Sequence, residues 1–549
     1  MRICGIKFGH DGAIAVIEDG RLLASIELEK LDNQSRHCPL HDMNDVFRIL
    51  TVMGLSVQDI DHFAIDGWHA HSRNLFAWNT REHHLPRAAY LQTPLDVNLL
   101  APLSVKQLEI SYRSWPHYAG HALGAYCSSP FSAARRSSYL LSWDGGMVPY
   151  LYYFDAAVGA VGTVHNIGPL FSIVGDLYAE IAAGRGPFNA NPTGFESLGT
   201  PGKIMAYVAY GTAREDLIDR FRKYFDTLPA LTDATMASNY EANLDILRQI
   251  RADDAFNNAD DNDVITSYHT FIQIRLLESL HTLITARPEL DRRLCFAGGC
   301  ALNIKWNQAI RNSAMFEDMW VPPFPNDAGS ALGAACCAMI VEQGRTALDW
   351  SVYSGPPFLN DERPQGWSAE DCKLDELARI LHEEGKPILF LDGNAEIGPR
   401  ALGNRSILAP ANGAAMKRHL NEIKNREDYR PVAPICLEQY ASEVFDPGSS
   451  DPYMLYDHKI REDWRQRVPA IMHKDGTARL QTVNAQQHPK IHTLLSAYHA
   501  LSGVPLLCNT SANLNQKGFF PDLQSAVQWG GATTIWSDGK LYRAPSTDR

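Results

Sequence analysis

A strand–turn–strand unit that occurs twice is the feature that most constrains the fold of this chain. Residues 2–8 alternate like a strand, and they are followed by the tight turn 9–12, a second strand at 13–17, the hairpin signal Asp19-Gly20 and a third strand at 22–29. The same order returns at residues 139–143, 144–146, 150–154 and 160–167. Two such hairpins well over a hundred residues apart predict a duplicated α/β unit that closes on a cleft.

Composition excludes several classes of protein. The chain has 549 residues, enough for two to four domains, and its apolar content of 45% is that of an ordinary globular protein. The formal net charge is −13, and the sequence contains no block of like charges. Both features argue against nucleic acid as a partner. The ten cysteines follow no metal or secretory spacing, and neither a signal peptide nor a membrane span is recognisable. We therefore expect a cytoplasmic protein with free thiols and no membrane partner.

Two histidines four residues apart give the first chemical signal. His117 and His121 follow Pro116 in a small-residue run that predicts a helix, so both imidazoles would share one face. Asp144 comes where the strand at 139–143 ends. Two imidazoles with one or two carboxylates make a mixed N/O ligand set that suits a divalent transition metal and is similar to the Fe(II) arrangement of two histidines and a carboxylate. The alternative is two histidines on a helix surface and a turn aspartate.

Glycine turns between strands and helices indicate anion binding. Gly298-Gly299 joins a buried strand to the region of Asn303, and helix N-termini after such turns bind phosphates. Glycines also surround Lys203, although their spacing is not that of a P-loop. A second strand–turn–helix contains Asp327, which could cap its helix or complete the metal site. Nucleotide-binding proteins of the actin, chaperone and sugar-kinase architecture share this organisation.

A Pro-rich, charged segment at 356–366 predicts a linker between a first domain at 1–355 and a second at 367–549. In the second domain, seven basic residues fall within the 31 positions from 400 to 430, broken up by glycine and proline. Arg400 in a Gly-Pro-Arg turn and Arg430 before a proline have constrained backbones, which suits an oxyanion site with guanidinium contacts. Arg479 and the strand end at 506–513, with its hydroxyls and amides, could add hydrogen bonds to a phosphate.

Taken together, these motifs resemble the O-carbamoyltransferases of the nodulation-protein and antibiotic-tailoring type. The resemblance spans both halves of the chain and rests on the order of the following motifs: HYAGHALGAYCSSPF, SWDGG, GKIMAYVAYG, GGCALN, NDAGSALGAA, GPRALGNRSILA, DGTARLQTV and NTSAN. It implies an N-terminal actin-like domain similar to the tRNA-threonylcarbamoylation ATPase fold. It also implies a C-terminal α/β domain of the YrdC-like, threonylcarbamoyl-adenylate synthase type.

The resemblance further implies an activity and a set of site residues. The C-terminal domain would form carbamoyl-adenylate from carbamoyl phosphate and ATP with Mg²⁺, and the N-terminal domain would transfer the carbamoyl group to a hydroxyl of a small natural product. His117, His121, Asp144 and Asp327 would hold iron or another divalent metal, and Lys203, Gly298, Gly299 and Asn303 would contact nucleotide. Carbamoyl phosphate would be bound by Arg400, Lys424, Arg430, Arg479, Asn509 and Ser511. His10 or Asp11 would orient the acceptor or take its proton, although His10 could equally be a turn residue.

The chain departs from the family's pattern at residues 27–37, ELEKLDNQSRH, where family members usually have more acidic and more basic residues. This difference places a role for Lys30 and Arg36 in doubt. Two other functions use similar motifs: a tRNA-modifying enzyme with the same two domains, and a non-catalytic nucleotide switch. The acidic charge disfavours the first, and the paired histidines and C-terminal arginines disfavour the second. Aminoglycoside, nucleoside, macrolide and cephem acceptors stay open, as does the oligomeric state.

Overall fold

A computed structural model describes residues 1–545 except 34, 69–74, 79–80, 92–97, 108–109, 189–193, 360–362 and 515. The chain divides into two compact units. Unit 1 comprises Met1–Leu28 and His37–Ser351, and unit 2 comprises Glu29–Arg36 and Val352–Arg549. The short segment Glu29–Arg36 therefore belongs to unit 2, whereas the sequence-based division assigns it to the first domain. Three residues of the predicted linker, 360–362, lie outside the described residues.

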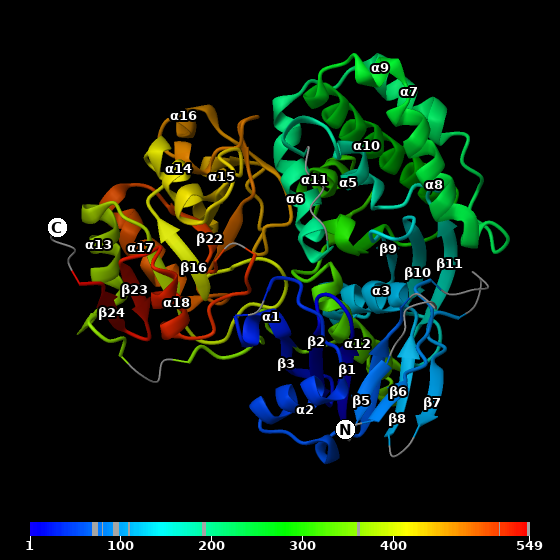
Figure 1. Ribbon diagram of the computed structural model, residues 1–549, viewed down its shortest axis with the longest axis horizontal. Coiled ribbons are helices and arrows are strands. Elements are labelled where there is room, and N and C mark those ends of the chain that lie inside the picture. The colour runs from blue at the N-terminus through cyan, green and yellow to red at the C-terminus, as the bar shows by residue number, and fades with distance from the viewer. Residues whose placement is uncertain are drawn as a thin grey trace. The chain divides into compact units, whose positions relative to one another are not determined.

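The first sheet of unit 1 begins with the N-terminal hairpin (Figure 1). In sheet order its strands are β3 (Arg21–Glu27), β2 (Ala13–Glu18), β1 (Arg2–Lys7), β4 (His62–Asp66), β8 (Ile110–Trp115) and β7 (Leu103–Gln107). The first three strands pair antiparallel, and β4 and β8 then add in parallel to β1. The third strand ends two residues earlier than predicted, because the chain turns into the short helix α1 (Leu28–Leu31).

The second sheet of unit 1 repeats this order. Its strands are β11 (Thr163–Pro169), β10 (Tyr150–Asp155), β9 (Ser138–Ser142), β12 (Arg293–Ala297) and β13 (Asp318–Trp320). Again three antiparallel strands are followed by two parallel ones. Counted along the chain within each sheet, the order is third, second, first, fourth, sixth, fifth in the first sheet and third, second, first, fourth, fifth in the second. Apart from the additional edge strand β7, the two sheets therefore share the topology expected of a duplicated unit.

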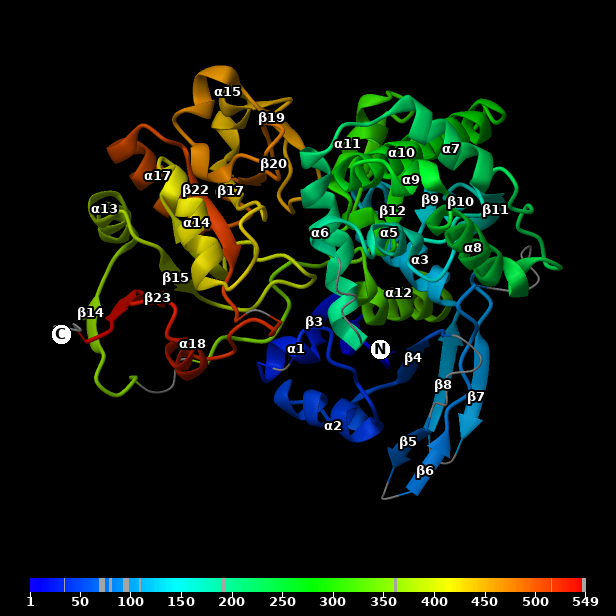
Figure 2. The ribbon, with the colours of Figure 1, turned by 45° about the horizontal axis from the view of Figure 1, so that its top comes forward.

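Two helices of small residues pack on the sheets of unit 1, α12 on the first sheet and α3 on the second. α3 (His117–Ser128) follows the first sheet, α12 (Ser330–Gln343) follows the second, and the two lie side by side (Figures 1 and 2). Their backbones meet at glycines: a Cβ on Gly333 would clash with the main-chain oxygen of Gly120. This close approach needs glycine, and it fixes α3 and the segment before α12 relative to each other.

A helical layer completes unit 1. It consists of α5 (Leu177–Ala182), α6 (Thr200–Tyr207), α7 (Glu215–Phe225), α8 (Met236–Arg251), α10 (Asp261–Thr285) and α11 (Ile304–Asn312). The sequence favours a long amphipathic helix over residues 265–286. The structure confirms it as α10, which packs on α5, α6, α7 and α11. Among the described helices of the chain, none joins sufficient length to the apolar character that a membrane crossing requires.

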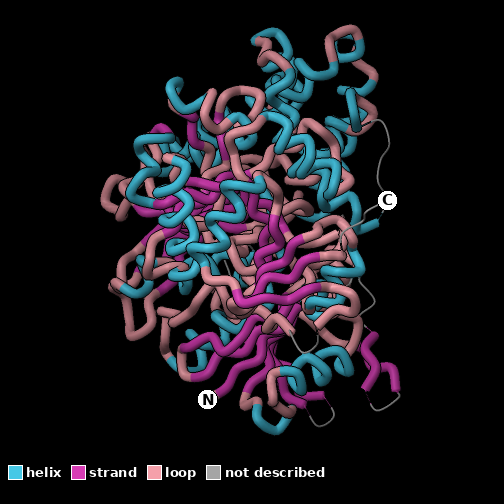
Figure 3. The backbone as a smooth tube through the Cα atoms, turned by 90° about the vertical axis from the view of Figure 1, so that its left-hand side faces the viewer, coloured by secondary structure: helices cyan, strands magenta, loops and turns pink. Residues whose placement is uncertain are grey.

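Unit 2 is built on an eight-stranded sheet, and the strands of both units are magenta in Figure 3. In sheet order these strands are β14 (Ser368–Asp371), β24 (Lys540–Arg543), β23 (Thr534–Ser537), β15 (Ile388–Leu391), β16 (Arg405–Ala409), β22 (Leu506–Ser511), β17 (Ala433–Leu437) and β21 (Gln481–Val483). The main helices are α13 (Leu374–Glu384), α14 (Ala414–Ile423), α17 (Pro489–Ser502) and α18 (Leu523–Trp529). Both units are therefore mixed α/β.

One helix prediction in unit 2 is partly wrong. The sequence favours a helix over 369–384, but Ser368–Asp371 forms the edge strand β14, and α13 begins at Leu374. The edge position explains the error, because β14 pairs with β24 from the far end of the chain and its four side chains are all exposed. A strand without an apolar face carries no alternating hydrophobic signal.

Candidate functional site

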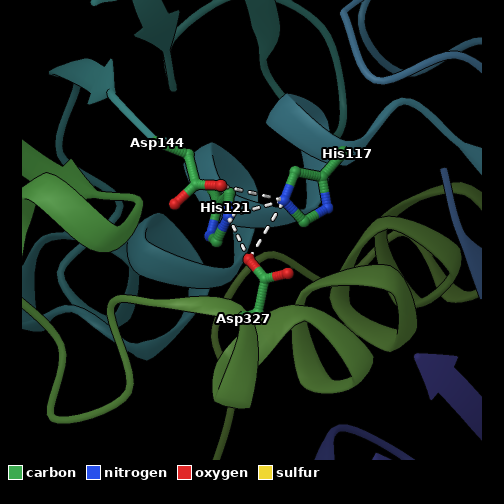
Figure 4. A group of neighbouring side chains, drawn as sticks. All are labelled: His117, His121, Asp144 and Asp327. Atoms are coloured by element: carbon green, nitrogen blue, oxygen red, sulfur yellow. Dashed lines mark hydrogen bonds and ion pairs between the residues drawn. The ribbon is translucent and has the colours of Figure 1, made fainter. Parts of the chain in front are cut away.

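Four side chains from three parts of unit 1 converge on one point (Figure 4). His117 and His121 come from the first two turns of α3, Asp144 follows β9, and Asp327 lies before α12. One ligand atom from each residue lies within 4.8 Å of the others. Both histidines are buried, with exposed fractions of 0% and 4%. The alternative of two histidines on a helix surface is therefore wrong.

The imidazoles present nitrogen atoms to the carboxylates. His117 Nε2 lies 3.0 Å from His121 Nε2, 3.2 Å from Asp327 Oδ1 and 3.7 Å from Asp144 Oδ2. His121 Nε2 lies 3.4 Å from the same Oδ1 atom of Asp327. Nitrogen and carboxylate oxygen atoms thus point at a shared centre, which is the arrangement of ligands around a cation.

A second layer of residues orients these ligands. Asp66 Oδ2 accepts a hydrogen bond from His117 Nδ1 at 2.8 Å, which leaves Nε2 as the ring atom that carries the lone pair. The Tyr90 hydroxyl donates to Asp144 Oδ2, and the Gly299 amide donates to Asp144 Oδ1 at 2.7 Å. Lys7 Nζ lies 3.2 Å from Asp327 Oδ2. Asp66, Lys7 and Tyr90 were not recognised from the sequence, because only the fold brings them to the site.

The electrostatics of this cluster favour negative carboxylates. Burial alone would raise the pKa of Asp327, but Lys7 and His117 outweigh it and hold that pKa well below its usual range. Burial and Asp327 raise the pKa of Asp144, yet the two histidines bring it down to about 2. For His117 burial acts to lower the pKa, and the carboxylates of Asp66 and Asp327 raise it well above its ordinary value.

The donor set fits a divalent transition metal. Both carboxylate oxygens of Asp327 are buried and accept no hydrogen bond from any described residue, although Lys7 and the histidines lie within ion-pair distance. Two imidazole nitrogens 3.0 Å apart with lone pairs directed at one point are unfavourable unless a proton or a cation lies between them. Imidazole with carboxylate is the ligand set of iron, zinc and similar ions. The residues present therefore match the cofactor that the sequence indicates.

His10 and Asp11 border the same centre. His10 Nε2 lies 3.6 Å from Asp327 Oδ2, and His10 Nδ1 lies 3.0 Å from Asp11 Oδ2. The side chain of His10 is 22% exposed, against 4% for Asp327. His10 thus lies beside the proposed metal ligands and remains partly accessible, which a base acting on a bound molecule needs.

Two of the predicted nucleotide contacts also have structural tasks. The Gly299 amide is engaged with Asp144, and Asn303 caps α11 by accepting from the amides of Lys305 and Trp306. Gly298 adopts a φ of 92°, and a Cβ there would collide with the backbone of Trp143, so this position needs glycine. Lys203 lies on α6. Nucleotide contact by these residues stays a prediction.

Basic side chains gather in unit 2 around the turn that contains Arg400. Arg400, Arg430, Arg479 and Arg36, here called the arginine cluster, lie close together, and the pKa values of Arg400, Arg430 and Arg479 are each lowered in part by other members of the cluster. Burial contributes most, so that the pKa of Arg400 is held well below its usual value and that of Arg479 falls to about 10. Asp451 is the carboxylate that opposes this effect at Arg400 and Arg479. Buried guanidinium groups in excess of nearby carboxylates are suited to an oxyanion.

Unsatisfied polar atoms support this interpretation of the arginine cluster. The Nε atoms of Arg400 and Arg479 and the Oδ1 atom of Asn509 are buried without a hydrogen-bond partner in the described part of the chain. The Asn509 amide nitrogen donates to Ala401 O and Gln481 Oε1 and so ties β22 to the Arg400 turn. Native proteins rarely leave such atoms unpaired, so each one indicates a place for a missing partner.

Lys424 has a different environment from the one predicted. Its ammonium group donates to the main-chain oxygens of Ser511 and Asn513, both at 2.6 Å, and also to Asn513 Oδ1. Three acceptors occupy the three N–H groups of a lysine. In this structure Lys424 therefore holds the end of β22, and a direct contact with carbamoyl phosphate stays a prediction.

The segment whose role the sequence placed in doubt contributes to unit 2. Arg36 adds to the arginine cluster, and the Lys30 Nζ atom donates to the carbonyl oxygens of Glu396 and Gly398 at 2.7 and 2.6 Å. Glu396 in turn accepts from the amides of Leu402 and Asn404, both at 2.7 Å. The turn that contains Arg400 is thus fixed from both sides, and Lys30 and Arg36, whose role the sequence left in doubt, both contribute to this region of unit 2.

Comparisons with known proteins match the chain over nearly its whole length. A family model described as carbamoyltransferase N-terminus matches residues 2–336, and one described as carbamoyltransferase C-terminus matches residues 378–535. The chain is 42% identical to Nodulation protein U of Sinorhizobium fredii (strain NBRC 101917 / NGR234) over 562 residues, which covers 100% of both chains. It is 32% identical to the 3'-hydroxymethylcephem-O-carbamoyltransferase of Amycolatopsis lactamdurans, with 96% of each chain covered.

Solved structures give only distant likenesses. A ROK family protein from Streptococcus pneumoniae TIGR4 in complex with sucrose is 11% identical, with 63% of this chain and 99% of that chain covered and a TM-score of 0.28. Full-length HypF in its phosphate- and nucleotide-bound form is 13% identical, with 62% and 56% covered and a TM-score of 0.29. Both TM-scores are too low to assign a fold.

Proposed function

The chain belongs to the carbamoyltransferase family, and we propose that it uses carbamoyl phosphate and ATP to carbamoylate a hydroxyl group of a small molecule. Family membership makes it an enzyme of carbamoyl transfer. The relative of Amycolatopsis lactamdurans is named for O-carbamoylation of a hydroxymethyl group. A hydroxyl-bearing acceptor of low molecular weight, such as a secondary metabolite, is the corresponding proposal for this chain.

In this proposal unit 2 activates the carbamoyl group. The phosphate of carbamoyl phosphate would be bound by Arg400, Arg430 and Arg479, with Arg36 nearby and Asn509 and Ser511 at the end of β22. Hydrolysis of carbamoyl phosphate by water would release inorganic phosphate and carbamate, and attack of a carbamate oxygen on the α-phosphorus of ATP with Mg²⁺ would give carbamoyl-adenylate and release pyrophosphate. The lowered pKa values of Arg400, Arg430 and Arg479, to which neighbouring arginines contribute, support this assignment, because an anion relieves the repulsion between guanidinium groups. We further propose that unit 2 has the YrdC-like fold.

Unit 1 would perform the transfer, and we propose an actin-like fold for it because its two sheets have the same strand order apart from the additional edge strand β7. His117, His121, Asp144 and Asp327 would hold Fe(II) or another divalent transition metal. When bound, such an ion acts as a Lewis acid that stabilises negative charge developing on oxygen. Lys203, the Gly298-Gly299 turn and Asn303 would contact the nucleotide part of the adenylate.

The residues of the chain supply the remaining chemistry. The acceptor oxygen attacks the carbamoyl carbon, the bond from that carbon to the phosphate oxygen breaks, and AMP leaves. The hydroxyl proton must be accepted during the attack, and His10 Nε2 is the candidate base because it lies at the ligand cluster and stays partly accessible. Asp11, on the other ring nitrogen, would orient that base.

One observation carries the proposal: a single chain combines a buried cluster of two histidines and two aspartates with a buried excess of arginine. The first suits a metal that acts on oxygen, and the second suits a phosphate. A nucleotide switch needs neither. A tRNA-modifying enzyme would use the first but would add a basic surface for RNA, and the chain has a formal net charge of −13.

The test separates the two half-reactions. Purified protein is incubated with ATP, Mg²⁺ and carbamoyl phosphate, and pyrophosphate and carbamoyl-adenylate are measured. We expect adenylate from the wild type and from His117→Ala, and about 10²- to 10³-fold slower adenylate formation in Arg400→Met. Transfer to hydroxyl acceptors and metal content are expected to be lost in His117→Ala. If no metal condition gives adenylate, the proposed function is wrong; if His117→Ala still transfers, the ligand assignment is wrong.

A further inference from the structure

A carboxylate in unit 1 is bound between two imidazoles beside the proposed metal ligands. His37 Nδ1 lies 2.7 Å from Asp11 Oδ1, and His10 Nδ1 lies 3.0 Å from Asp11 Oδ2. Each carboxylate oxygen thus accepts from one ring. Asp11 and His37 are largely buried, with side-chain exposures of 10% and 11%. Neither the sequence motifs nor the comparisons give His37 a role.

This contact fixes how His10 presents its second nitrogen. A carboxylate accepts hydrogen bonds, so the Nδ1 atoms of both rings carry the proton. Neutral His10 then has its lone pair on Nε2, the atom that lies 3.6 Å from Asp327 Oδ2. The ring also packs edge-on against Trp68, with centroids 5.3 Å apart, which limits its rotation. The tautomer and the direction of His10 therefore both depend on Asp11.

The backbones of Asp11 and His37 are strained in the same way. Asp11 has a φ of 52° and His37 a φ of 61°, a left-handed conformation that is uncommon for residues other than glycine. Strain of this kind persists where surrounding contacts fix it, and it is concentrated at functional sites. It indicates that the position of the Asp11 carboxylate is held at a cost in stability.

Main-chain hydrogen bonds hold the two strained residues together. The Asp11 amide donates to His37 O at 3.3 Å, and the Gly12 amide donates to Cys38 O at 3.0 Å. Gly9 and Leu40 exchange two further bonds, at 3.0 and 3.1 Å. The segment from His37 to Leu40 is therefore paired along the whole turn between β1 and β2, and the His37 side chain is part of a fixed frame.

We infer that His37 is a positioning residue of the transfer reaction, which acts through Asp11 to direct the Nε2 lone pair of His10 toward the acceptor hydroxyl. The inference rests on the proposed function. In the reaction, the acceptor oxygen forms a bond to the carbamoyl carbon, the carbon–oxygen bond to AMP breaks, and the hydroxyl proton passes to His10 Nε2. His37 takes no proton and touches no substrate. Its role is to keep Asp11 from turning away from His10.

The two imidazoles on either side of Asp11 also determine its charge. Burial raises the pKa of Asp11, but His37 and the hydrogen bonds from both rings outweigh burial and hold that pKa well below its usual range. Asp11 therefore stays ionised behind His10, as the carboxylate does in a histidine–aspartate pair that serves a base. Loss of His37 would remove one of its two partners and free the carboxylate to rotate.

Two substitutions at one position test the inference without disturbing the backbone. His37→Gly accepts a positive φ without strain and removes the side chain, whereas His37→Asn tolerates that φ and places an amide N–H close to the position of Nδ1. His41→Asn, at an exposed histidine four residues further on, is the matched control. Zinc-loaded crystals of the variants give the His10 ring orientation, and transfer to hydroxylamine and to a simple primary alcohol gives the rates.

The expected results distinguish positioning from folding. In His37→Gly, kcat for the alcohol falls on the order of 10²-fold, with KM changed less than about threefold, and the His10 ring turns. The rate of transfer to hydroxylamine, a nucleophile that needs little help from a base, falls much less in this variant. His37→Asn recovers most of the alcohol rate, and His41→Asn equals wild type in both assays.

Carbamoyl-adenylate formation is measured in every variant, so that failure of the inference and failure of the proposed function are distinguishable. Absence of adenylate or of any transfer in the wild type refutes the proposed function and with it this role. If the wild type transfers to hydroxylamine but His37→Gly retains the wild-type His10 orientation and transfer rates, the inference is wrong. Equal losses with hydroxylamine and the alcohol, or no recovery in His37→Asn, would also overturn it.

Discussion

The Nδ1 atom of His117 lies 2.8 Å from Oδ2 of Asp66, and both side chains are completely or almost completely buried. Asp66 ends β4 in the first sheet, whereas His117 begins α3. A hydrogen bond across 51 residues therefore fixes which nitrogen of His117 faces Asp327. The second oxygen of Asp66 is buried without a hydrogen-bond partner among the described residues, which is consistent with a position set for its effect on His117.

We expect Asp66→Ala to weaken metal binding by about 10- to 100-fold, because outer-sphere partners of metal-bound histidines contribute that much to affinity. Transfer should fall with metal content, and adenylate formation in unit 2 should be unchanged. Metal analysis after dialysis against graded chelator gives the affinity. Asp66→Asn, which keeps an acceptor of the same shape, is the control. Its metal affinity should lie between that of wild type and that of Asp66→Ala. Equal metal affinity in wild type and Asp66→Ala would contradict the prediction.

Removal of one guanidinium group should separate stability from function in unit 2. Arg400→Met relieves the repulsion among buried like charges, so the protein without an anion should be at least as stable as wild type, by thermal unfolding. Adenylate formation should nevertheless fall about 10²- to 10³-fold, the usual effect of losing one donor to a developing negative charge.

Phosphate provides the second readout for Arg400. Inorganic phosphate should raise the melting temperature of wild type more than that of Arg400→Met, because a ligand stabilises only the form that binds it. Arg418→Met removes an exposed arginine on α14 and should leave both quantities unchanged. A lower melting temperature of Arg400→Met without phosphate would show that Arg400 has a structural role instead.

The contact between α3 and α12 should control the metal site from a distance. In Gly333→Ala the new methyl group meets the main-chain oxygen of Gly120, which cannot move without its helix. We expect a loss of about 1–3 kcal/mol in unfolding free energy and weaker metal binding, since α3 carries both histidines. Gly413→Ala, where no atom lies within 4 Å of the added Cβ, is the control. Unfolding by denaturant and metal analysis test both variants.

The sequence predicted those parts of the site whose residues follow local rules. The spacing of His117 and His121 places both on one helix face, and Asp144 is found at the predicted strand end. Local rules could not decide whether Asp327 caps a helix or joins the cluster, because that depends on how close α12 lies to α3. The contacts of Asp66 and Lys7 could not be predicted for the same reason. Both residues lie on the first sheet, and no local sequence pattern relates that sheet to α3.

The duplicated hairpins were readable because alternation and Gly-containing turns mark strands, and both sheets of unit 1 have the resulting order. The sheet of unit 2 could not be predicted from the sequence, since it pairs β14 with β24 across almost the whole unit. The segment with Arg36 and Lys30 shows the same limit. Its composition departs from the family pattern, yet its backbone bonds to unit 2, with Arg36 N–H donating to Gln516 O at 2.9 Å.

His488 should make the stability of unit 2 depend on pH. Its ring is buried at the start of α17, where Nδ1 accepts from the Ile491 amide and Nε2 donates to Asn404 Oδ1. Burial lowers the pKa of His488 to about 4 from an ordinary value of 6.5. Between these values the unfolded chain binds a proton that the folded chain does not, so folding stability rises with pH across this window and is lost as pH falls toward 4.

The size of the effect follows from the shift. A difference of roughly two and a half pKa units corresponds to about 3 kcal/mol between pH 4 and pH 7. His488→Gln has no proton to gain, so urea unfolding of this variant between pH 4 and pH 7 should show a flatter profile than wild type, with lower stability at pH 7. His382→Gln, at an exposed histidine of α13, should keep the wild-type slope. Parallel profiles for wild type and His488→Gln would mean that another group causes the loss of stability in acid.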